Sequence, residues 1–316
     1  MRHGLGWRSQ QMTLTAVACL AMVGLPPSAA QAKSDGPKAI TVDAIPVDAM
    51  PVNGAPVNAT PLGTPQLEEP TPTAAVPPAC AAQLGRNINA IIGQPTYRSG
   101  KWGVHVESLD TGEVIYSHNP NQYLIPASNI KLFTTAAALQ LYDARSPIDS
   151  STLGNWVQTI NQRSHNGYAD SLLRRIGGAG TARRALGQLG ITDYRQADGS
   201  GLSRQNLVTP RAVVKTLQVM NHAHGRDVFY RSLPLAGHSG TLSRRFRSTA
   251  AQGIVRAKTG TLRGVRALSG YLEHPRYGRL VFSILVNQPG QNGQTLINGI
   301  DRIVLQMATL NACYPV

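Results

Sequence analysis

A run of closely spaced prolines divides the chain and limits where a folded domain can form. From Ile45 to Pro61 the residues read Ile-Pro-Val-Asp-Ala-Met-Pro-Val-Asn-Gly-Ala-Pro-Val-Asn-Ala-Thr-Pro, a degenerate repeat of about five residues. Proline removes backbone donors, and apolar residues here follow neither the helical nor the strand period. We therefore interpret residues 33–79 as a disordered, Pro-rich linker and residues 80–316 as one folded domain.

The first 32 residues have the pattern of a secretory signal peptide. Arg2 and Arg8 precede an apolar run, Met12–Leu25, which is short for a membrane span. A small-x-small cleavage site, Ala30–Ala32, follows. We expect an exported chain in the periplasm or cell envelope, with no stable membrane span after cleavage. A retained membrane anchor is the competing interpretation.

The chain is strongly basic, with 30 Lys and Arg residues against 16 Asp and Glu and a formal net charge of +14. Such a charge favours an anionic partner. Export and an aromatic content of 5% argue against nucleic acid, so we expect an anionic wall polymer or peptide carboxylates. Basicity that serves only solubility is the alternative. Arg244, Arg245 and Arg247 are interpreted as a solvated basic face.

Two cysteines, Cys80 and Cys313, lie at the ends of the predicted domain. In an oxidising compartment such a pair is a disulfide candidate. The eight histidines are scattered and no Cys-x-x-Cys occurs, so the sequence predicts no metal site.

Hydrophobic periodicity predicts an α/β domain of the α+β kind. The economical arrangement is one five-stranded antiparallel sheet, with the first and last helices side by side on one face and a helical subdomain beside it. Besides a helix that begins near Ser128, the expected helices cover residues 80–92, 155–177 with a break near Ser164, 181–189, 210–221 and 294–310. The expected strands cover residues 102–109, 114–117, 253–261, 265–273 and 280–286.

The segment Pro126–Leu139 places Ser128 three residues ahead of Lys131, at the predicted start of an Ala/Leu-rich helix. Residues at i and i+3 share a helix face, so the lysine amine can reach the serine hydroxyl. A serine beside a lysine with a lowered pKa is a nucleophile with its base. An N-capped surface helix is the ordinary alternative for this tetrapeptide.

Two further segments supply polar groups. Ser164–Asn166 lies at the break in the helical block, where the serine could pass a proton and the asparagine could bind a substrate amide. Lys258–Thr261 lies on a predicted strand, where the lysine and threonines suit a carboxylate and the glycine allows close backbone approach to a ligand. Taken singly, the first is equally a helix-break turn, and the second an edge strand that ends in a turn.

The order of these motifs, Ser-x-x-Lys, Ser-x-Asn and Lys-Thr-Gly, resembles that of the low-molecular-mass class C penicillin-binding proteins. That family consists of D-alanyl-D-alanine carboxypeptidases and endopeptidases with a β-lactamase-like fold. The similarity covers most of residues 96–287. It is carried by the segments Pro126–Lys131, Asn161–Asp170, Asp198–Arg204, Gly240–Phe246 and Arg256–Leu262.

The resemblance implies an acyl-transfer site that needs no cofactor, with peptidoglycan stem peptides as substrates and β-lactams as covalent inhibitors. It makes Ser128 the nucleophile, Lys131 its base and Ser164 the proton relay. Burial and the like charge of Lys258 should lower the Lys131 pKa. Substrate binding falls on Asn166, Lys258, Thr259, Gly260 and Thr261, with the backbone N–H groups of Ser128 and Thr261 as the oxyanion hole.

One departure from the family is large. Its members carry a long insertion between the first and second motifs, whereas here 36 residues separate Ser128 and Ser164. We expect the catalytic core to stand alone. A β-lactamase or related serine esterase is the alternative enzyme, although residues 128–250 contain no glutamate to activate a deacylating water. A non-catalytic cell-wall-binding protein is the alternative outside enzymes.

Overall fold

The computed structural model describes residues 74–311. The predicted signal peptide, the predicted linker up to residue 73, and Cys313 lie outside the described residues. Across 74–311, no helix combines the length and apolar character that a bilayer crossing needs.

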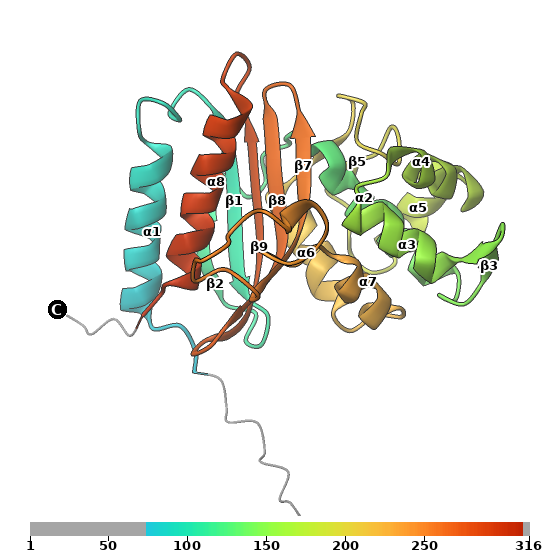
Figure 1. The fold of residues 1–316 in the computed structure, drawn as a ribbon, viewed down its shortest axis with the longest axis horizontal. Helices are drawn as coiled ribbons and strands as arrows, with labels where there is room; N and C mark the ends of the chain where they lie inside the picture. The colour runs from blue at the N-terminus through green and yellow to red at the C-terminus, as the bar shows by residue number, and fades with distance from the viewer. Residues whose placement is uncertain (1–73, 312–316) are drawn as a thin grey trace, which may run out of the picture. The chain divides into compact units, whose positions relative to one another are not determined.

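One antiparallel sheet forms the centre of the described domain (Figure 1). Its strand order is β2-β1-β9-β8-β7, so the first hairpin of the chain lies beside the last strand. The predicted five-stranded sheet is confirmed, because each strand lies within two residues of its expected bounds. The strands are β1 (Lys101–Ser108), β2 (Val114–His118), β7 (Val255–Leu262), β8 (Val265–His274) and β9 (Gly278–Asn287).

Both faces of this sheet are buried. On β9, Phe282 and Ile284 belong to one hydrophobic core, whereas Val281 and Leu285 belong to the core on the opposite face. This alternation follows from strand geometry, in which successive side chains point to opposite faces. The stretch from Leu280 to Val286 is therefore buried throughout.

Helices α1 (Pro78–Ile92) and α8 (Gly293–Ala308) lie side by side on one face of the sheet, which confirms the expected arrangement (Figure 1). Leu84 and Ile88 recur at helical spacing on α1 and pack into the core of that face. Val76, ahead of α1, is already part of this core.

Of the two cysteines in the candidate disulfide, only Cys80 lies within the described residues. Cys80 is buried on α1, and its sulfur lies 3.2 Å from the carbonyl oxygen of Asn311, two residues before Cys313. A Cys80–Cys313 bond stays a prediction, because Cys313 lies outside the described residues.

The opposite face of the sheet is covered by α6, and the helical block extends from it (Figure 1). The predicted break in the long helix is confirmed as the gap between α3 and α4. The periodicity of the sequence does not predict α7 or the four short strands, which are too short for a repeat. The block contains α2 (Ile130–Leu141), α3 (Leu153–Gln162), α4 (Asn166–Arg175), α5 (Gly178–Gly187), α6 (Pro210–Met220) and α7 (Arg226–Ser232), with β3 (Pro147–Ile148), β4 (Ser151–Thr152), β5 (Tyr194–Arg195) and β6 (Leu207–Val208).

Helix α2 is the centre of the helical block. Its residues from Ile130 to Leu139 are all buried, and it packs against α3, α4, α5 and α6. A 3-10 turn, η1 (Ala127–Asn129), leads into it, and no side chain caps its first turn. The alternative of an N-capped surface helix is therefore wrong. Ser128 lies in η1, at the entrance to a buried helix.

The link between α2 and α3 is short and folded. It contains the β3–β4 hairpin, and Arg175 of α4 forms an ion pair with Asp149 in the hairpin turn at 2.7 Å. Both Arg175 and Asp149 are half exposed, so their ion pair contributes little stability.

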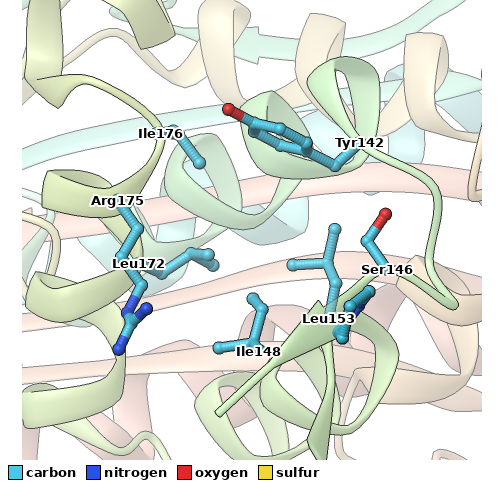
Figure 2. A pocket seen from close by; sticks show the side chains of 8 residues that line it. Tyr142, Ser146, Ile148, Leu153, Leu172, Arg175 and Ile176 are labelled. Atoms are coloured by element: carbon cyan, nitrogen blue, oxygen red, sulfur yellow. The ribbon is translucent and has the colours of Figure 1, made fainter. Parts of the chain in front are cut away.

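A cavity of about 200 Å³ lies beside the hairpin, lined by Tyr142, Leu172 and neighbouring side chains (Figure 2).

The loop between β5 and β6 packs directly against η1. Gly201 in this loop has a φ of +88°, and a Cβ built there would overlap the Ala127 carbonyl oxygen. Gly199 meets the same limit at the Ala169 carbonyl oxygen. Close backbone packing therefore explains both glycines of the Asp-Gly-Ser-Gly stretch. Ala127 itself has a φ of +47°, which is costly for a residue with a side chain.

Replacement of Gly201 by alanine should destabilise the domain strongly. The substitution adds a left-handed residue with a Cβ, which costs roughly 1–2 kcal/mol, and a clash with the Ala127 carbonyl oxygen. Gly112→Ala is the matched control, because φ there is +71° and a Cβ meets nothing within 4 Å. Thermal unfolding should give a clearly lower midpoint for Gly201→Ala than for Gly112→Ala, and equal midpoints would contradict the packing argument.

Candidate active site

Lys131 is fully buried in the first turn of α2 and donates hydrogen bonds to three oxygens. Its Nζ lies 2.9 Å from Ser128 Oγ and 2.8 Å from Asn166 Oδ1, and it also donates to the Ser200 carbonyl oxygen. Asn166 begins α4, and Ser200 lies in the loop against η1. Three separate segments therefore meet at this amine.

The surroundings of Lys131 lower the pKa of its ammonium group to about 8. Burial is the main cause, because it removes water from the charged form, while the carboxylates of Asp170 and Asp198 act in the opposite direction. From the sequence, the charge of Lys258 is expected to lower the pKa of Lys131. In the structure the affected residue is Lys258, whose pKa is lowered by the charge of Lys131. A fraction of Lys131 is therefore neutral near pH 7, as a general base requires.

Lys258 of β7 is also completely buried. It donates to Ser164 Oγ at 2.8 Å and to the Thr259 carbonyl oxygen at 3.0 Å. Burial, followed by the charge of Lys131, holds its pKa well below the usual value. The ion pairs within residues 74–311 include neither lysine, so hydroxyl, amide and carbonyl oxygens are the direct partners of both amines, and the Asp170 and Asp198 carboxylates act on Lys131 without touching it.

Ser164 occupies a strained turn between α3 and α4. Its φ is +56°, in the left-handed region that residues with a Cβ rarely adopt. His165 closes the turn, because its Nδ1 accepts from the Tyr168 backbone N–H at 3.2 Å and caps α4. The turn directs Ser164 to Lys258, while Asn166 contacts Lys131. Strain of this kind persists only where surrounding contacts fix it.

Gly260 of β7 faces the protein rather than open space. A Cβ there would lie 2.6 Å from the Pro126 carbonyl oxygen and 2.9 Å from Ala267 Cβ. The glycine thus allows η1 to pack against β7, which explains its presence without a ligand. Thr259 and Thr261, on either side, alternate to the other face of this edge strand, and both remain accessible.

The loop that contains Asp198 belongs to the site, a role that the sequence left open. The Asp198 carboxylate accepts from the backbone N–H groups of Gly201 and Ser203, both at 2.6 Å. The resulting turn presents the Ser200 carbonyl oxygen to Lys131. The sequence feature that could have indicated this role is the aspartate beside turn-forming residues, but the same pattern is typical of ordinary surface turns.

The assembled side chains have the chemistry that the sequence predicts for a nucleophile, a base and a proton relay. Ser128, Lys131, Ser164, Asn166 and Lys258 come together where η1, α2, α4 and β7 meet. In the part of the chain that the structure describes, no three His, Cys, Asp or Glu side chains gather closely enough to hold a metal ion. The arrangement suits covalent catalysis by protein groups.

Asp170→Asn should lower the pKa of Lys131 below about 8, because burial is then less opposed by negative charge. The Asp170 Oδ1 accepts from the Gly199 backbone N–H at 2.9 Å, and asparagine keeps this acceptor. An NMR titration of isotope-labelled lysine side chains measures the pKa directly. Asp193→Asn removes an exposed carboxylate and is the charge-matched control; equal shifts in both variants would refute the assignment.

A family model matches most of the described chain. The D-Ala-D-Ala carboxypeptidase 3 (S13) family is matched by residues 84–151 and 146–308. The two matched segments meet at residues 146–151, within the link that joins α2 to α3. This is the interval in which the sequence lacks the long insertion.

Curated relatives are longer than the part they share with this chain. A D-alanyl-D-alanine carboxypeptidase from Actinomadura sp. is 43% identical over 177 residues, which cover 50% of this chain and 32% of the relative. A carboxypeptidase DacB from Mycolicibacterium smegmatis is 30% identical over 223 residues, which cover 62% of this chain and 46% of the relative. The chain thus spans about a third to a half of these relatives.

Solved structures share the fold. Penicillin binding protein 4 from Haemophilus influenzae matches with a TM-score of 0.60 at 15% identity, covering 69% of this chain and 98% of that chain. A class A β-lactamase from Bacteroides cellulosilyticus gives 0.57 at 16% identity, covering 73% and 99%. The predicted β-lactamase-like fold is confirmed. Because the family model matches well over half of its residues, the chain belongs to the D-Ala-D-Ala carboxypeptidase 3 (S13) family.

Proposed function

We propose that the chain is a serine-type D-Ala-D-Ala carboxypeptidase that acts on peptidoglycan stem peptides through an acyl-enzyme on Ser128. The observation that carries the proposal is the buried contact of 2.9 Å between Lys131 Nζ and Ser128 Oγ. Membership of the family and a relative named D-alanyl-D-alanine carboxypeptidase support it. Endopeptidase cleavage of a peptide cross-link would use the same groups and the same chemistry.

Acylation begins when neutral Lys131 takes the proton of the Ser128 hydroxyl. The serine oxygen attacks the carbonyl carbon of the scissile peptide bond and forms a C–O bond. Backbone N–H groups of Ser128 and Thr261 stabilise the oxyanion, by a few kcal/mol each. The C–N bond then breaks, and the proton held by Lys131 passes through the Ser164 hydroxyl to the departing amine, which leaves Lys131 neutral again; Lys258 orients Ser164 by its hydrogen bond.

Hydrolysis of the acyl-enzyme uses the same base. A water molecule attacks the ester carbonyl, Lys131 accepts the water proton, and the Ser128 oxygen leaves and regains a proton. Asn166 positions the substrate amide. Its Oδ1 accepts from Lys131, so its Nδ2 group is the donor offered to substrate.

A β-lactamase is the second candidate, because solved β-lactamases share the fold. Class A enzymes use a glutamate in deacylation, and residues 128–250 contain none. The nearby carboxylates of Asp170 and Asp198 accept hydrogen bonds from the loop backbone instead. We therefore infer that β-lactams acylate Ser128 and leave slowly. The Haemophilus influenzae protein of the same fold has been solved with a β-lactam.

An envelope location and an anionic partner fit this function. The family takes its name from a D-Ala-D-Ala carboxypeptidase, and the proposed substrate, peptidoglycan, is a polymer of the cell envelope. The pattern of residues 1–32 and the net charge of +14 support export and attraction to wall carboxylates. Nucleic acid is not among the proposed partners.

A fluorescent penicillin should label the wild-type chain covalently, and Ser128→Ala should abolish the label. Ser117→Ala is the matched control, because Ser117 Oγ lies 3.2 Å from His105 Nδ1 and so has a basic neighbour outside the candidate site. Gel fluorescence after denaturation measures the label. Labelling that survives in Ser128→Ala, or disappears in Ser117→Ala, would reject Ser128 as the nucleophile.

The acylation rate should rise with pH up to about 8 and level off above it. The reason is that only neutral Lys131 can take the serine proton, and its amount grows about tenfold per pH unit below the pKa. Stopped-flow measurement of penicillin acylation between about pH 6 and pH 10 tests this, because the range extends roughly two units either side of the expected pKa. A rate that is flat across this range would exclude Lys131 as the base.

A further inference from the structure

A second cavity lies where α5 begins, and its volume is about 290 Å³. Its lining comes from the first two turns of α5 and from β5 with the residue that follows it. These lining residues are Ala179, Gly180, Arg183, Tyr194, Arg195 and Gln196. The candidate catalytic and substrate-binding residues are not among them, so the cavity is a separate site.

The first turn of α5 contributes positive potential to this cavity. The helix begins in residues 177–180, Gly-Gly-Ala-Gly, and its N-cap residue Gly177 has a φ of +93°. Within the described chain, no side chain caps this turn, and the turn holds no acidic residue. The N–H groups of a first helical turn have no partner inside the helix and carry the positive end of its dipole. This end of α5 therefore favours an anion.

Two arginines of the cavity form no ion pair with a carboxylate of residues 74–311. They are Arg183 and Arg195, both exposed, and Arg195 is held over the Tyr123 ring, 5.5 Å from its centroid. Arg245 differs, because its Nη2 lies 2.5 Å from Asp301 Oδ1. The interpretation of Arg245 as part of a solvated basic face is therefore wrong. Arg183 and Arg195 keep their charge for a ligand.

Tyr194 brings a buried hydroxyl group to the cavity. Its side chain is 2% exposed, and the hydroxyl has no hydrogen-bond partner among residues 74–311. The ring stacks on Phe133 with centroids 4.5 Å apart. Burial raises the pKa of Tyr194 to about 12, and the charge of Arg183 opposes this rise, so the hydroxyl stays protonated and lies near that guanidinium. A buried donor without a partner is costly, and an oxygen of a ligand would remove that cost.

Gln196 adds an acceptor beside these donors. Its Nε2 donates to Thr134 Oγ1 at 2.7 Å, while its Oε1 is buried without a hydrogen-bond partner in residues 74–311. An amide oxygen repels an anion but accepts from a hydroxyl group. The lining thus matches an anion that carries a hydroxyl group of its own.

The arrangement of donors favours phosphate over carboxylate. Guanidinium groups, a phenol and backbone N–H groups approach the cavity from two separate elements. The oxygens of a phosphate ester point in several directions and can meet such donors together, whereas the two oxygens of a carboxylate lie in one plane. A membrane surface is less suitable, because the exposed ring that lies beside the cavity, Tyr123, is covered by the charge of Arg195.

We propose that this cavity binds a water-soluble polyol phosphate, of which glycerol phosphate, free or as the unit of an anionic polymer, is the simplest example. The phosphate contacts Arg183, Arg195, the Tyr194 hydroxyl and the first turn of α5, and a hydroxyl of the polyol donates to Gln196 Oε1. The site does not involve Ser128, so this inference goes beyond the proposed function and does not depend on it.

Titration calorimetry of the full chain with glycerol phosphate tests the site. Binding should be saturable, and it should be tighter than that of inorganic phosphate, which has no polyol hydroxyl. Arg183→Gln should weaken binding by about 10- to 100-fold, because it removes a charged donor. Arg231→Gln is the charge-matched control, since Arg231 is exposed on α7 and does not line the cavity, and it should leave the affinity unchanged.

Tyr194→Phe separates a binding role from a structural one. It should weaken binding by about 3- to 10-fold, but it should not lower the midpoint of thermal unfolding, because it removes a buried hydroxyl that has no partner in the described protein. A lower midpoint with unchanged affinity would assign the hydroxyl a structural role and overturn the proposal.

Three further results would overturn the inference. They are the lack of saturable binding of glycerol phosphate, an equal loss of affinity in Arg231→Gln and Arg183→Gln, and an affinity for inorganic phosphate as high as that for glycerol phosphate. Vesicles of phosphatidylglycerol and of phosphatidylcholine test the lipid source. Cosedimentation with the anionic vesicles that disappears in Arg183→Gln, without binding of free glycerol phosphate, would replace the soluble ligand by a lipid headgroup.

Discussion

Two lysine amines buried in one site are the constraint on which the rest of this structure depends. Lys131 and Lys258 are both 0% exposed, and their partners are hydroxyl, amide and carbonyl oxygens. A charged amine without water is costly unless such dipoles surround it or its proton is lost more easily. Both amines are surrounded by such dipoles, and the pKa of each is also lowered. The segments that supply the oxygens must therefore converge.

That convergence accounts for the strained backbone around the site. Ala127 and Ser164 have left-handed backbone conformations although both carry a Cβ. Ala127 precedes Ser128, whose Oγ accepts from Lys131, and Ser164 Oγ accepts from Lys258. Gly201 and Gly260 remove the Cβ atoms that would keep the loop and β7 away from η1. Backbone strain at the site thus coincides with the segments that contact the two amines, as is typical of a functional site, although Asn119, Asp149, Phe246 and Ser248 are also left-handed elsewhere in residues 74–311.

The sheet and its terminal helices were predictable because their signals are local, such as the alternation on β9 and the helical spacing of Leu84 and Ile88. The candidate side chains came from the order of three motifs in a familiar family. The contact between Lys131 and the Ser200 carbonyl oxygen was not predictable, because it joins residues 69 positions apart through a backbone atom. The interpretation of Arg245 as part of a solvated basic face is wrong for the same reason, because its ion-pair partner Asp301 is 56 positions away in the sequence.

The pairing of α1 with α8 has a mechanical consequence. Cys80 lies 3.2 Å from the Asn311 carbonyl oxygen, so both ends of the described domain meet beside α1, which packs on β2. β2 and β7 are opposite edges of the sheet, and four strand spacings of about 4.8 Å put roughly 19 Å between them. Tension applied through either end therefore enters at the terminal helices: α1 passes it to β2, on the edge far from Lys258, whereas α8 packs on β8, the neighbour of the strand with Lys258.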